Sequence, residues 1–230
     1  MNADHDGSRT ADPEPPEGPV LFDMDGVLVD SETYWHRFED EWVFDEAIEG
    51  GDPAHEEVTG MQYREIYDYL DREYGTTVTK DEFVAAYQDR AESLYGDDVT
   101  LTEGVPEVFA ALRAAGRPIA VVSSAPQAWI AIVRERFDLD PLDLVLSAED
   151  IDAPGKPEPH IYERAAAELG VEPERCVVVE DSLNGIEAAV GSGAYTIAFR
   201  TTHNAELDLS RADVVADGPE GLRRVLLGGE

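Results

Sequence analysis

The sequence contains a single cysteine, only two lysines and no long run of apolar residues. A transmembrane helix needs about 20 consecutive, predominantly apolar residues, so we expect no membrane-spanning segment and no membrane partner. Cys176 has no second cysteine with which to form an internal disulfide, and we expect it to be a small core residue. The first seven residues are acidic and polar, whereas a secretory signal needs a basic and then an apolar stretch. These absences predict a cytoplasmic protein.

Basic residues are scarce: 17 lysines and arginines stand against 51 acidic residues, which gives a formal charge of −34. Such a charge repels nucleic acids and anionic membranes, so neither is an expected partner. Acidity of this degree also occurs in disordered chains, but 43% hydrophobic residues in periodic patterns predict a folded protein. Concentrated salt screens dense negative charge, so the composition predicts a halophilic protein. We expect it to be a monomer or a weak dimer.

The two lysines are Lys80 and Lys156, and the other 15 basic residues are arginines. Lys156 stands in a rigid Gly-Lys-Pro-Glu-Pro segment that precedes a predicted helix. Lysine offers a compact point charge where arginine offers a planar fork, so a site crowded with carboxylates favours lysine. Lys156 is therefore a candidate site residue, and the alternative is an ordinary surface lysine.

The composition changes along the chain and indicates a domain organisation. Residues 1–18 combine Asp, Glu, Pro and Gly with almost no apolar content, which predicts a disordered acidic tail. Twelve of the 19 aromatic residues lie within 34–95. A small insertion needs large side chains to fill its own core, so we expect an all-helical cap domain at 33–96. The core domain would then consist of 19–32 and 97–230.

Short apolar runs alternate with helical patterns in the rest of the chain. Helix starts are marked by the capping box Thr79-Lys-Asp-Glu82 and by Ser182, and a helix end is marked by Gly170. This alternation predicts an α/β fold, with a parallel sheet covered by helices on both faces in a Rossmann-like, three-layer core. The expected strands are 19–25, 119–122, 144–146, 176–179, 195–199 and 213–215.

Two aspartates, Asp23 and Asp25, stand one residue apart at the end of the first apolar run and just before Gly26. In a strand, positions i and i+2 project to the same side, so both carboxylates are expected to point into one site. Two like charges this close raise each other's pKa unless a cation or a proton separates them. The alternative is a solvated acidic turn.

Three further polar groups follow predicted strands or the loops after them: Ser123–Ser124, Lys156 and Glu180–Asp181. In an open parallel sheet the carboxyl ends of the strands lie along one edge, and ligands bind in the crevice there. Four segments that are far apart in the sequence are therefore expected to meet at one site.

These four segments also carry a family resemblance, which covers nearly everything from Pro19 onward. The sequence resembles the haloacid dehalogenase-like (HAD) hydrolase superfamily, in the subgroup with a small helical cap that includes phosphoglycolate phosphatases and β-phosphoglucomutases. Together with the acidic composition, the resemblance indicates a haloarchaeal source. The matching segments, in the family's order, are Asp23-Met-Asp-Gly-Val-Leu-Val-Asp-Ser-Glu, Val-Val-Ser123, Gly-Lys156-Pro-Glu-Pro and Val-Val-Val-Glu180-Asp181-Ser-Leu-Asn-Gly.

The resemblance implies a phosphatase that hydrolyses a small phosphorylated metabolite, a phosphate monoester, through an aspartyl-phosphate. Asp23 would be the nucleophile, and Asp25 would be the acid for the leaving alcohol and then the base for water. The cofactor would be Mg²⁺, which prefers oxygen ligands. Its protein ligands would be Asp23, the main-chain carbonyl of Asp25, Asp181 and, directly or through water, Glu180.

The resemblance also implies how the phosphate is held. Lys156 would neutralise the nucleophile and the phosphate together, and Ser123 would bind a phosphate oxygen with backbone N–H groups. Gly26 would allow the backbone to approach the phosphate closely. Further candidates for substrate binding are Trp35, His36, Tyr63, Arg64, Ser124 and Asn184.

The cap candidates have an alternative interpretation as ordinary helix surface or cap core. In the phosphatase interpretation, Arg64 could hold a second anionic group such as a carboxylate. Sugar phosphomutases of the β-phosphoglucomutase type share the core motifs and remain an alternative function. Ungapped alignment places Trp35 where those enzymes have a proton-transferring histidine, with His36 one position later, and Tyr63 where they have a cap arginine. These departures favour a phosphatase, although a single gap would reverse the argument.

Other branches of the superfamily agree less well with the sequence. Haloacid dehalogenases lack the second aspartate, and phosphonate hydrolases replace it and use a cap lysine; this chain has Asp25, and Lys80 belongs to a capping box. A HAD-like binding protein that has lost catalysis is a further alternative. Such a protein would be expected to have lost a motif residue, yet Asp23, Lys156 and Asp181 are all present.

Overall fold

The computed structural model describes residues 14–228, and most of the predicted acidic tail lies outside the described residues. The part of the tail that is described is held against the fold. Arg117 donates hydrogen bonds to the carbonyls of Pro16 and Gly18, each at 3.0 Å. Residues 16–18 therefore pack with the core domain.

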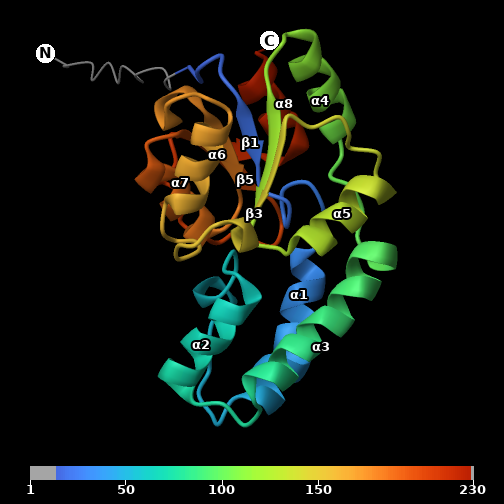
Figure 1. The fold of residues 1–230 in the computed structure, drawn as a ribbon, viewed down its shortest axis with the longest axis vertical. Coiled ribbons are helices and arrows are strands. Elements are labelled where there is room, and N and C mark those ends of the chain that lie inside the picture. Colours follow the sequence, from blue (N-terminus) through green and yellow to red (C-terminus); the bar gives the residue numbers. More distant parts are fainter. Residues whose placement is uncertain (1–13, 229–230) are drawn as a thin grey trace, which may run out of the picture.

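The centre of the molecule is a parallel sheet of six strands in the order β3-β2-β1-β4-β5-β6, which confirms the predicted α/β fold (Figure 1). Strand β1 lies in the middle of the sheet. The next two strands, β2 and β3, lie on one side of it, and β4, β5 and β6 lie on the other side. This reversal is the point at which α/β sheets form a ligand crevice. The strands are β1 (Val20–Phe22), β2 (Ile119–Ser123), β3 (Leu144–Ser147), β4 (Val177–Glu180), β5 (Tyr195–Arg200) and β6 (Val214–Asp217).

The central strands are apolar without alternation because helices cover both faces of the sheet. Phe22 and Val179 pack into one cluster, whereas Leu21 and Val178 pack into the other. Cys176 is fully buried in the second cluster, as predicted.

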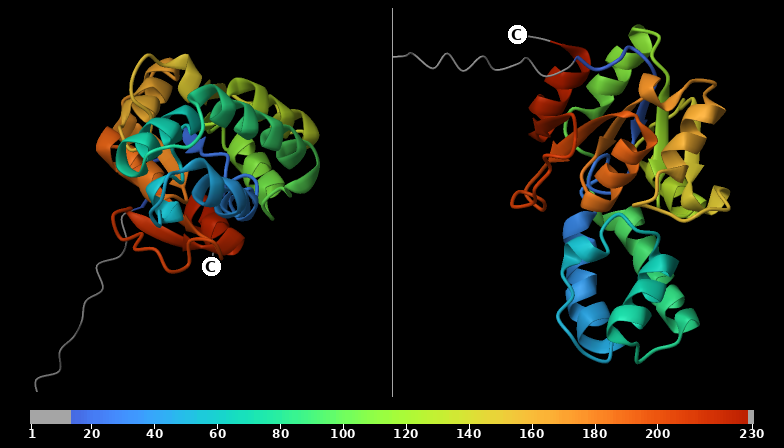
Figure 2. Two further views of the ribbon diagram at one scale, coloured as in Figure 1. Left: turned by 90° about the horizontal axis from the view of Figure 1, so that it is seen from below. Right: turned by 90° about the vertical axis from the view of Figure 1, so that its left-hand side faces the viewer.

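Helices α6 and α7 pack together on one face of the sheet, and α4 and α8 pack together on the opposite face, next to α5 (Figure 2). Small residues allow close packing of the first pair, with Ala165 on α6 and Ala188 on α7 fully buried. On the opposite face, Phe109 of α4 packs against Phe22, with ring centroids 5.1 Å apart. The core helices are α4 (Val105–Ala114), α5 (Gln127–Arg136), η4 (Ala148–Asp150), α6 (His160–Glu168), η5 (Pro173–Arg175), α7 (Leu183–Ser192) and α8 (Gly218–Leu227).

A helical lobe lies beyond the end of the sheet to which β1 runs, and it is joined to the core through α1 and α3 (Figures 1 and 2). Its interior is aromatic: Tyr87 lies against Trp35, Phe38 and Phe83 with ring centroids 4.9–5.3 Å apart. The predicted capping box is present at the start of α3, where the Thr79 N–H donates to Glu82 Oε2 at 2.9 Å. The lobe consists of α1 (Glu32–Phe38), η1 (Glu39–Ala47), η2 (His55–Glu57), α2 (Tyr63–Tyr74), α3 (Lys80–Ser93) and η3 (Leu94–Asp98). We take this lobe as the cap.

The first strand is shorter than predicted and ends at Phe22 instead of residue 25. The Asp23 N–H still donates to the Val179 carbonyl at 3.0 Å, but the backbone then turns, because Leu28 and Val29 both donate to the Met24 carbonyl. The two aspartates therefore lie on a loop, and the argument from strand periodicity does not apply to them. Within 14–228, no helix has the length and apolar content needed to cross a membrane.

Candidate active site

The four predicted site segments meet beyond the carboxyl ends of the central strands. Asp23 follows β1, Ser123 ends β2, and Glu180 ends β4 with Asp181 next to it. Lys156 reaches the same place from the loop before α6. Because β1 is hydrogen-bonded to both β2 and β4, parallel pairing alone brings three of these segments together.

Lys156 joins two carboxylates at the bottom of the site. Its Nζ atom lies 2.6 Å from Asp23 Oδ1 and 2.6 Å from Glu180 Oε1, and its side chain is 1% exposed. Burial alone would lower the pKa of Lys156, but Asp23 and Glu180 outweigh burial and raise this pKa, so the ammonium group stays charged. The Asp23 pKa is raised by burial and by neighbouring carboxylates, with Lys156 acting against both.

Glu180 accepts hydrogen bonds on both carboxylate oxygens. Tyr162 donates to the same Oε1 atom as Lys156, at 2.6 Å, and the Asp181 N–H donates to Oε2 at 3.1 Å. Gly185 makes room for this carboxylate, because a side chain at that position would overlap it. With its oxygens occupied by donors, Glu180 is better placed to act on a metal through water than directly.

Asp23, Glu180 and Asp181 have the composition of a magnesium site. Their carboxylate oxygens lie within 4.8 Å of one another, and all three residues are buried. Asp181 also receives a contact of 2.6 Å from His203 Nε2, and Asn204 donates to its main-chain carbonyl at 2.7 Å. Several buried carboxylates beside a single ammonium group leave a net negative charge, which a hard divalent cation would balance.

Asp25 is held by two hydroxyl groups. Ser31 Oγ and the Tyr95 hydroxyl each donate to Asp25 Oδ1 at 2.6 Å, and Trp35 Nε1 donates to the Tyr95 hydroxyl at 3.2 Å. Burial raises the pKa of Asp25, although the hydrogen bonds from Ser31 and Tyr95 act in the opposite direction. A carboxyl group with a raised pKa and a fixed orientation is suited to proton transfer.

The predicted phosphate-binding residues lie at the same place. Ser123 is buried, and its Oγ accepts a hydrogen bond from the Ala125 N–H at 3.0 Å. Ser124 donates to the carbonyl of Gly60 in the cap, at 2.7 Å. Gly26 has a φ of 71°, and a side chain there would overlap the carboxylate of Asp181, so this glycine allows the close approach of the metal-ligand candidate.

A cavity above these residues extends between the core and the cap, with about 600 Å³ of empty space including its mouth. Trp35, Tyr63 and Ser124 line it, and their contact with a substrate stays a prediction. The lining residues are Asp23, Asp25, Glu32, Trp35, Glu39, Val58, Thr59, Gly60, Met61, Tyr63, Ile66, Tyr87, Tyr95, Ser123, Ser124, Ala125, Trp129, Asp181 and Ser182.

Three of the predicted substrate-binding residues lie elsewhere. Arg64 lies over the ring of Tyr63, with its guanidinium carbon 4.6 Å from the ring centroid, and pairs with Glu149 at 3.4 Å. Asn184 donates to the Thr59 carbonyl at 2.8 Å, so it joins core to cap. His36 lines a neighbouring hollow, not this cavity.

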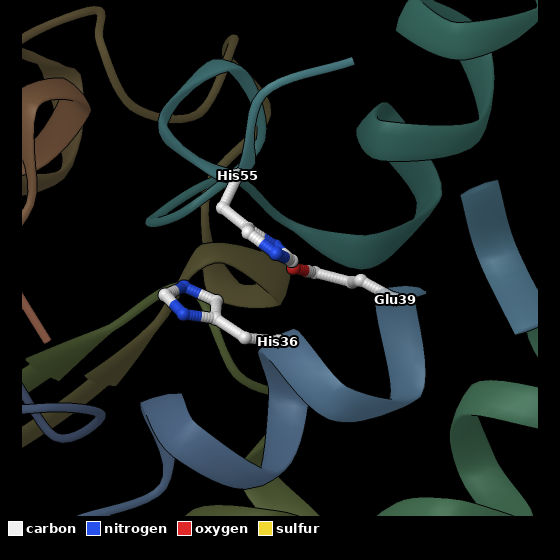
Figure 3. Close-up of side chains that lie close together, drawn as sticks. All are labelled: His36, Glu39 and His55. Atoms are coloured by element: carbon white, nitrogen blue, oxygen red, sulfur yellow. The ribbon is translucent and has the colours of Figure 1, made fainter. Parts of the chain in front are cut away.

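His36 belongs to a cluster with Glu39 and His55 at the junction of α1 and η2 (Figure 3). His55 Nδ1 lies 2.8 Å from Glu39 Oε2, its Nε2 lies 3.0 Å from Asp40 Oδ1, and its ring stacks on that of His36 at 4.1 Å. The Glu39 hydrogen bond raises the pKa of His55, whereas burial lowers the pKa of His36 to about 4. The contacts of His55 with Glu39 and Asp40, and its stacking on His36, link two cap segments.

Sequence reasoning missed several groups of the site. Tyr95 and Asp25 are 70 residues apart, and Tyr162 and Glu180 are joined only by the packing of α6 on the sheet. Glu32 and Glu39 looked like ordinary acidic residues in a chain with 51 of them, yet both are buried and line the cavity. No motif marks Tyr95, Tyr162 or Glu39, whereas Glu32 is the last residue of the first matching segment.

Comparisons with known proteins identify the family of this chain. A family model described as haloacid dehalogenase-like hydrolase matches residues 20–193. The chain is 34% identical to hexitol phosphatase B of Escherichia coli K12 over 176 residues, which cover 74% of this chain and 78% of that protein. It is 30% identical to 6-phosphogluconate phosphatase of the same organism over 186 residues, 78% of this chain and 81% of the relative. The crystal structure of CbbY from Rhodobacter sphaeroides in complex with phosphate matches with a TM-score of 0.70 and 24% identity, covering 88% of this chain and 94% of that one. The chain therefore belongs to the haloacid dehalogenase-like hydrolases.

Proposed function

We propose that this hydrolase is a magnesium-dependent phosphatase that hydrolyses a small phosphorylated sugar or related monoester through an aspartyl-phosphate on Asp23. The observation that carries the proposal is the pairing of Lys156 with Asp23 at 2.6 Å, beside Asp181 and beneath the cavity between core and cap. The names of the relatives, a hexitol phosphatase and a 6-phosphogluconate phosphatase, support a phosphorylated sugar as the substrate class.

In the first step, an Asp23 carboxylate oxygen attacks phosphorus, and the bond from phosphorus to the leaving oxygen breaks. Asp25 gives its proton to the departing alkoxide, so the alcohol leaves neutral. Lys156 holds the Asp23 carboxylate in place and balances the charge of the incoming phosphate. Ser123 lies at the end of β2, where its hydroxyl and the N–H groups that follow can bind phosphate oxygens.

In the second step, water attacks the phosphorus of the aspartyl-phosphate while the now ionised Asp25 accepts a proton from it. The bond between phosphorus and the Asp23 oxygen breaks, inorganic phosphate forms, and both aspartates return to their starting states. The hydrogen bonds from Ser31 and Tyr95 keep the Asp25 carboxyl oriented through both steps.

Asp23 and Asp181 would hold the Mg²⁺ ion, with Glu180 acting through water, because these oxygens already lie within 4.8 Å of one another. When bound, the ion screens the charge on the phosphate and on the clustered carboxylates.

The test is release of inorganic phosphate from p-nitrophenyl phosphate and from a panel of hexose and hexitol phosphates, with Mg²⁺ and with EDTA. We expect phosphate to appear at the rate at which substrate disappears, and Asp23→Asn to abolish turnover while the protein stays folded by circular dichroism. Isomerised sugar phosphate without phosphate release would establish a mutase instead. Full activity in Asp23→Asn, with deamidation excluded by mass spectrometry, would disprove the mechanism.

A further inference from the structure

Three of the four histidines in the described part of the chain line one hollow between cap and core, separate from the active-site cavity. They are His36 and His55 of the cap and His203 of the core, and the rings of His36 and His203 lie 6.4 Å apart between centroids. Glu56 and Asp181 also line the hollow, and its described lining residues include no lysine or arginine. Imidazoles gathered with carboxylates, without a basic residue to neutralise them, are typical of a metal site.

His36, Glu39 and His55 have the donor atoms of a transition-metal site. Their ligand atoms lie within 4.8 Å of one another, and the side chains point toward one another from α1, from the start of η1 and from η2 (Figure 3). His36 and Glu39 are three residues apart, a spacing that places two residues on the same side of a helix. The ligand atoms of a tetrahedral ion, each about 2.0–2.2 Å from the metal, lie roughly 3.3 Å apart. Small side-chain rotations therefore complete the set.

The Glu39 carboxyl group is buried with few partners. The residue is 4% exposed, and its only hydrogen-bond partner among the described residues is the His55 imidazole, at 2.8 Å. Buried carboxylates are costly unless they are paired or coordinate a metal. Glu39 is also the first residue of a π-helical segment, Glu39–Ala47. Such turns are rare and occur frequently at functional sites, so both observations favour a cation at Glu39.

His36 has a ring nitrogen without a close partner. Its Nε2 lies 3.4 Å from Thr59 Oγ1 and 3.5 Å from Glu32 Oε2, and both distances are longer than those of ordinary hydrogen bonds. No closer polar contact of His36 exists within the part of the chain that the structure describes. Its imidazole is therefore available as a metal ligand.

Asp40 supplies the outer contact that metal-binding histidines have. His55 Nδ1 faces Glu39 Oε2 at 2.8 Å, and His55 Nε2 lies 3.0 Å from Asp40 Oδ1. When an ion takes the place of the proton between Nδ1 and Glu39, the Nε2–H group still donates to Asp40. Histidines that bind a metal almost always donate their other N–H to a carboxylate, a carbonyl or water, which fixes the orientation of the ring.

We propose that His36, Glu39 and His55 bind a transition-metal ion of the Zn²⁺ type, with water in the fourth position. Two histidines, a glutamate and water are a ligand set that zinc uses in proteins. Imidazole nitrogens favour Zn²⁺ over Mg²⁺, whereas the proposed magnesium site offers only oxygens, so the two sites select different ions. The ion would join α1 to η2. It would thereby fix the segment that follows η2, whose Thr59 and Gly60 carbonyls accept hydrogen bonds from the core.

Titration of the full chain, without a histidine tag, with Zn²⁺ and with Co²⁺ tests the site. Excess Mg²⁺ and about 1 M KCl occupy the oxygen sites and screen the surface carboxylates. We expect one Zn²⁺ ion to bind per chain in calorimetry, and one Co²⁺ ion to give the intense visible absorption of a tetrahedral site, which Zn²⁺ then abolishes. If neither ion binds saturably under these conditions, the proposal fails, and the cluster is only a link between two cap segments.

Variants of the cluster locate the bound ion. We expect His55→Gln and His36→Gln each to weaken Zn²⁺ binding by roughly 100-fold or more, and Asp40→Asn to weaken it about 10- to 100-fold through the orientation of His55. His160→Gln is the matched control, because His160 begins α6 and pairs only with Glu163, at 3.4 Å. Circular dichroism checks that each variant is folded, and two ligand variants keep the test valid if one of them is not. Equal affinity in the folded ligand variants and in His160→Gln would overturn the proposal.

Two further measurements separate this site from the proposed magnesium site, and neither depends on turnover. Asp23→Asn removes a charge from the magnesium site but should keep both the Co²⁺ spectrum and the affinity for Zn²⁺. Because an ion that binds the folded state stabilises it, Zn²⁺ should raise the thermal midpoint of the natural chain and of His160→Gln, but not that of His55→Gln. A Co²⁺ spectrum that is lost in Asp23→Asn and kept in His55→Gln would place the ion at the catalytic carboxylates and refute the proposal.

Discussion

The hydroxyl group of Tyr95, a cap residue, donates a hydrogen bond to Asp25, the proposed acid and base. Its hydrogen bond to Asp25 opposes the effect of burial and keeps the pKa of that carboxyl lower than burial alone would. Asp25 must be protonated to serve as an acid, so the alkaline fall in kcat/KM for a poor leaving group reports the loss of its proton. Tyr95→Phe removes an interaction that favours the ionised form, and the Asp25 pKa must therefore rise.

We expect the alkaline limb of the profile for glycerol 2-phosphate to move to higher pH in Tyr95→Phe, with a lower kcat because the carboxyl is less well oriented. Tyr34→Phe is the control: the Tyr34 hydroxyl donates to the Asp98 carbonyl at 3.1 Å, and the residue does not line the cavity. A limb that stays in place, or moves to lower pH, would show that the hydroxyl does not tune Asp25.

The two lysines of the chain allow a comparison of how much a buried and an exposed ion pair stabilise the fold. Lys156 is buried between Asp23 and Glu180, whereas Lys80 pairs with Asp68 on the surface, with side chains 40% and 59% exposed. Breaking a buried ion pair leaves an unpaired buried charge and costs about 3–5 kcal/mol, whereas an exposed pair contributes less than about 1 kcal/mol.

Lys156→Met should therefore lower the free energy of unfolding by about 3–5 kcal/mol, and Lys80→Met by less than about 1 kcal/mol. Urea is the appropriate denaturant because guanidinium chloride would also change the ionic strength. Similar losses in the two variants would mean that the buried carboxylates take up protons and remain stable without the ammonium group.

At the scale of the element, the cap is held against the core by hydrogen bonds between side chains and the main chain. Ser124 and Asn184 of the core donate to the carbonyls of Gly60 and Thr59, and the Gly155 N–H donates to Glu65 Oε1 at 3.0 Å. The segment between η2 and α2 therefore forms both a wall of the cavity and a polar contact between cap and core. Closure of this kind excludes water from the site before the phosphoryl group moves.

Gly60→Ala tests this contact. Gly60 has a φ of 84°, and a side chain there would overlap the Ser182 hydroxyl, so the segment must withdraw from the core. Gly104 has a φ of 81° and nothing within 4 Å of the added carbon, so Gly104→Ala has the same backbone strain without the overlap. Both variants should lose about 1 kcal/mol of stability, but only Gly60→Ala should lose about tenfold or more in kcat/KM. Equal activity in the two variants would show that the closed contact is not needed for turnover.

Sequence patterns predict the positions of the helices and strands well, but they predict the contacts between these elements poorly. The strand at 176–179 and the helix after Ser182 were found to within about a residue because both faces of the sheet require apolar runs and because helix starts need caps. The first strand ended early, since the turn at Met24 depends on hydrogen bonds that no local pattern specifies. The core motif residues could be named from their order along the chain. Tyr87 and Tyr95 could not, because an aromatic residue in a helix usually signifies packing, and only the tertiary fold brings these residues to the cavity.

At the scale of the whole molecule, the charge of −34 acts on both folding and substrate capture. Carboxylates repel one another across the surface, and the same field repels an incoming phosphate dianion. At about 0.01 M salt the Debye length is about 30 Å, so nearly the whole surface contributes, whereas near 1 M it is about 3 Å and the repulsion becomes local. Screening should therefore favour the folded state and the encounter with substrate together.

We predict that the thermal midpoint and kcat/KM both rise when KCl is increased from about 0.1 M to above about 1 M at saturating Mg²⁺. Millimolar Mg²⁺ alone should occupy the site without replacing this bulk screening. A non-electrolyte such as sucrose, at the same osmolality, separates screening from general exclusion of the solute from the protein surface, since both stabilise folded proteins. If sucrose reproduces the whole effect, or if the protein is equally stable and active in dilute buffer, its acidity is not an adaptation to salt. The assignment of Asp23 and Asp25 would be unaffected, because it depends on contacts within a few ångströms that ionic strength hardly screens.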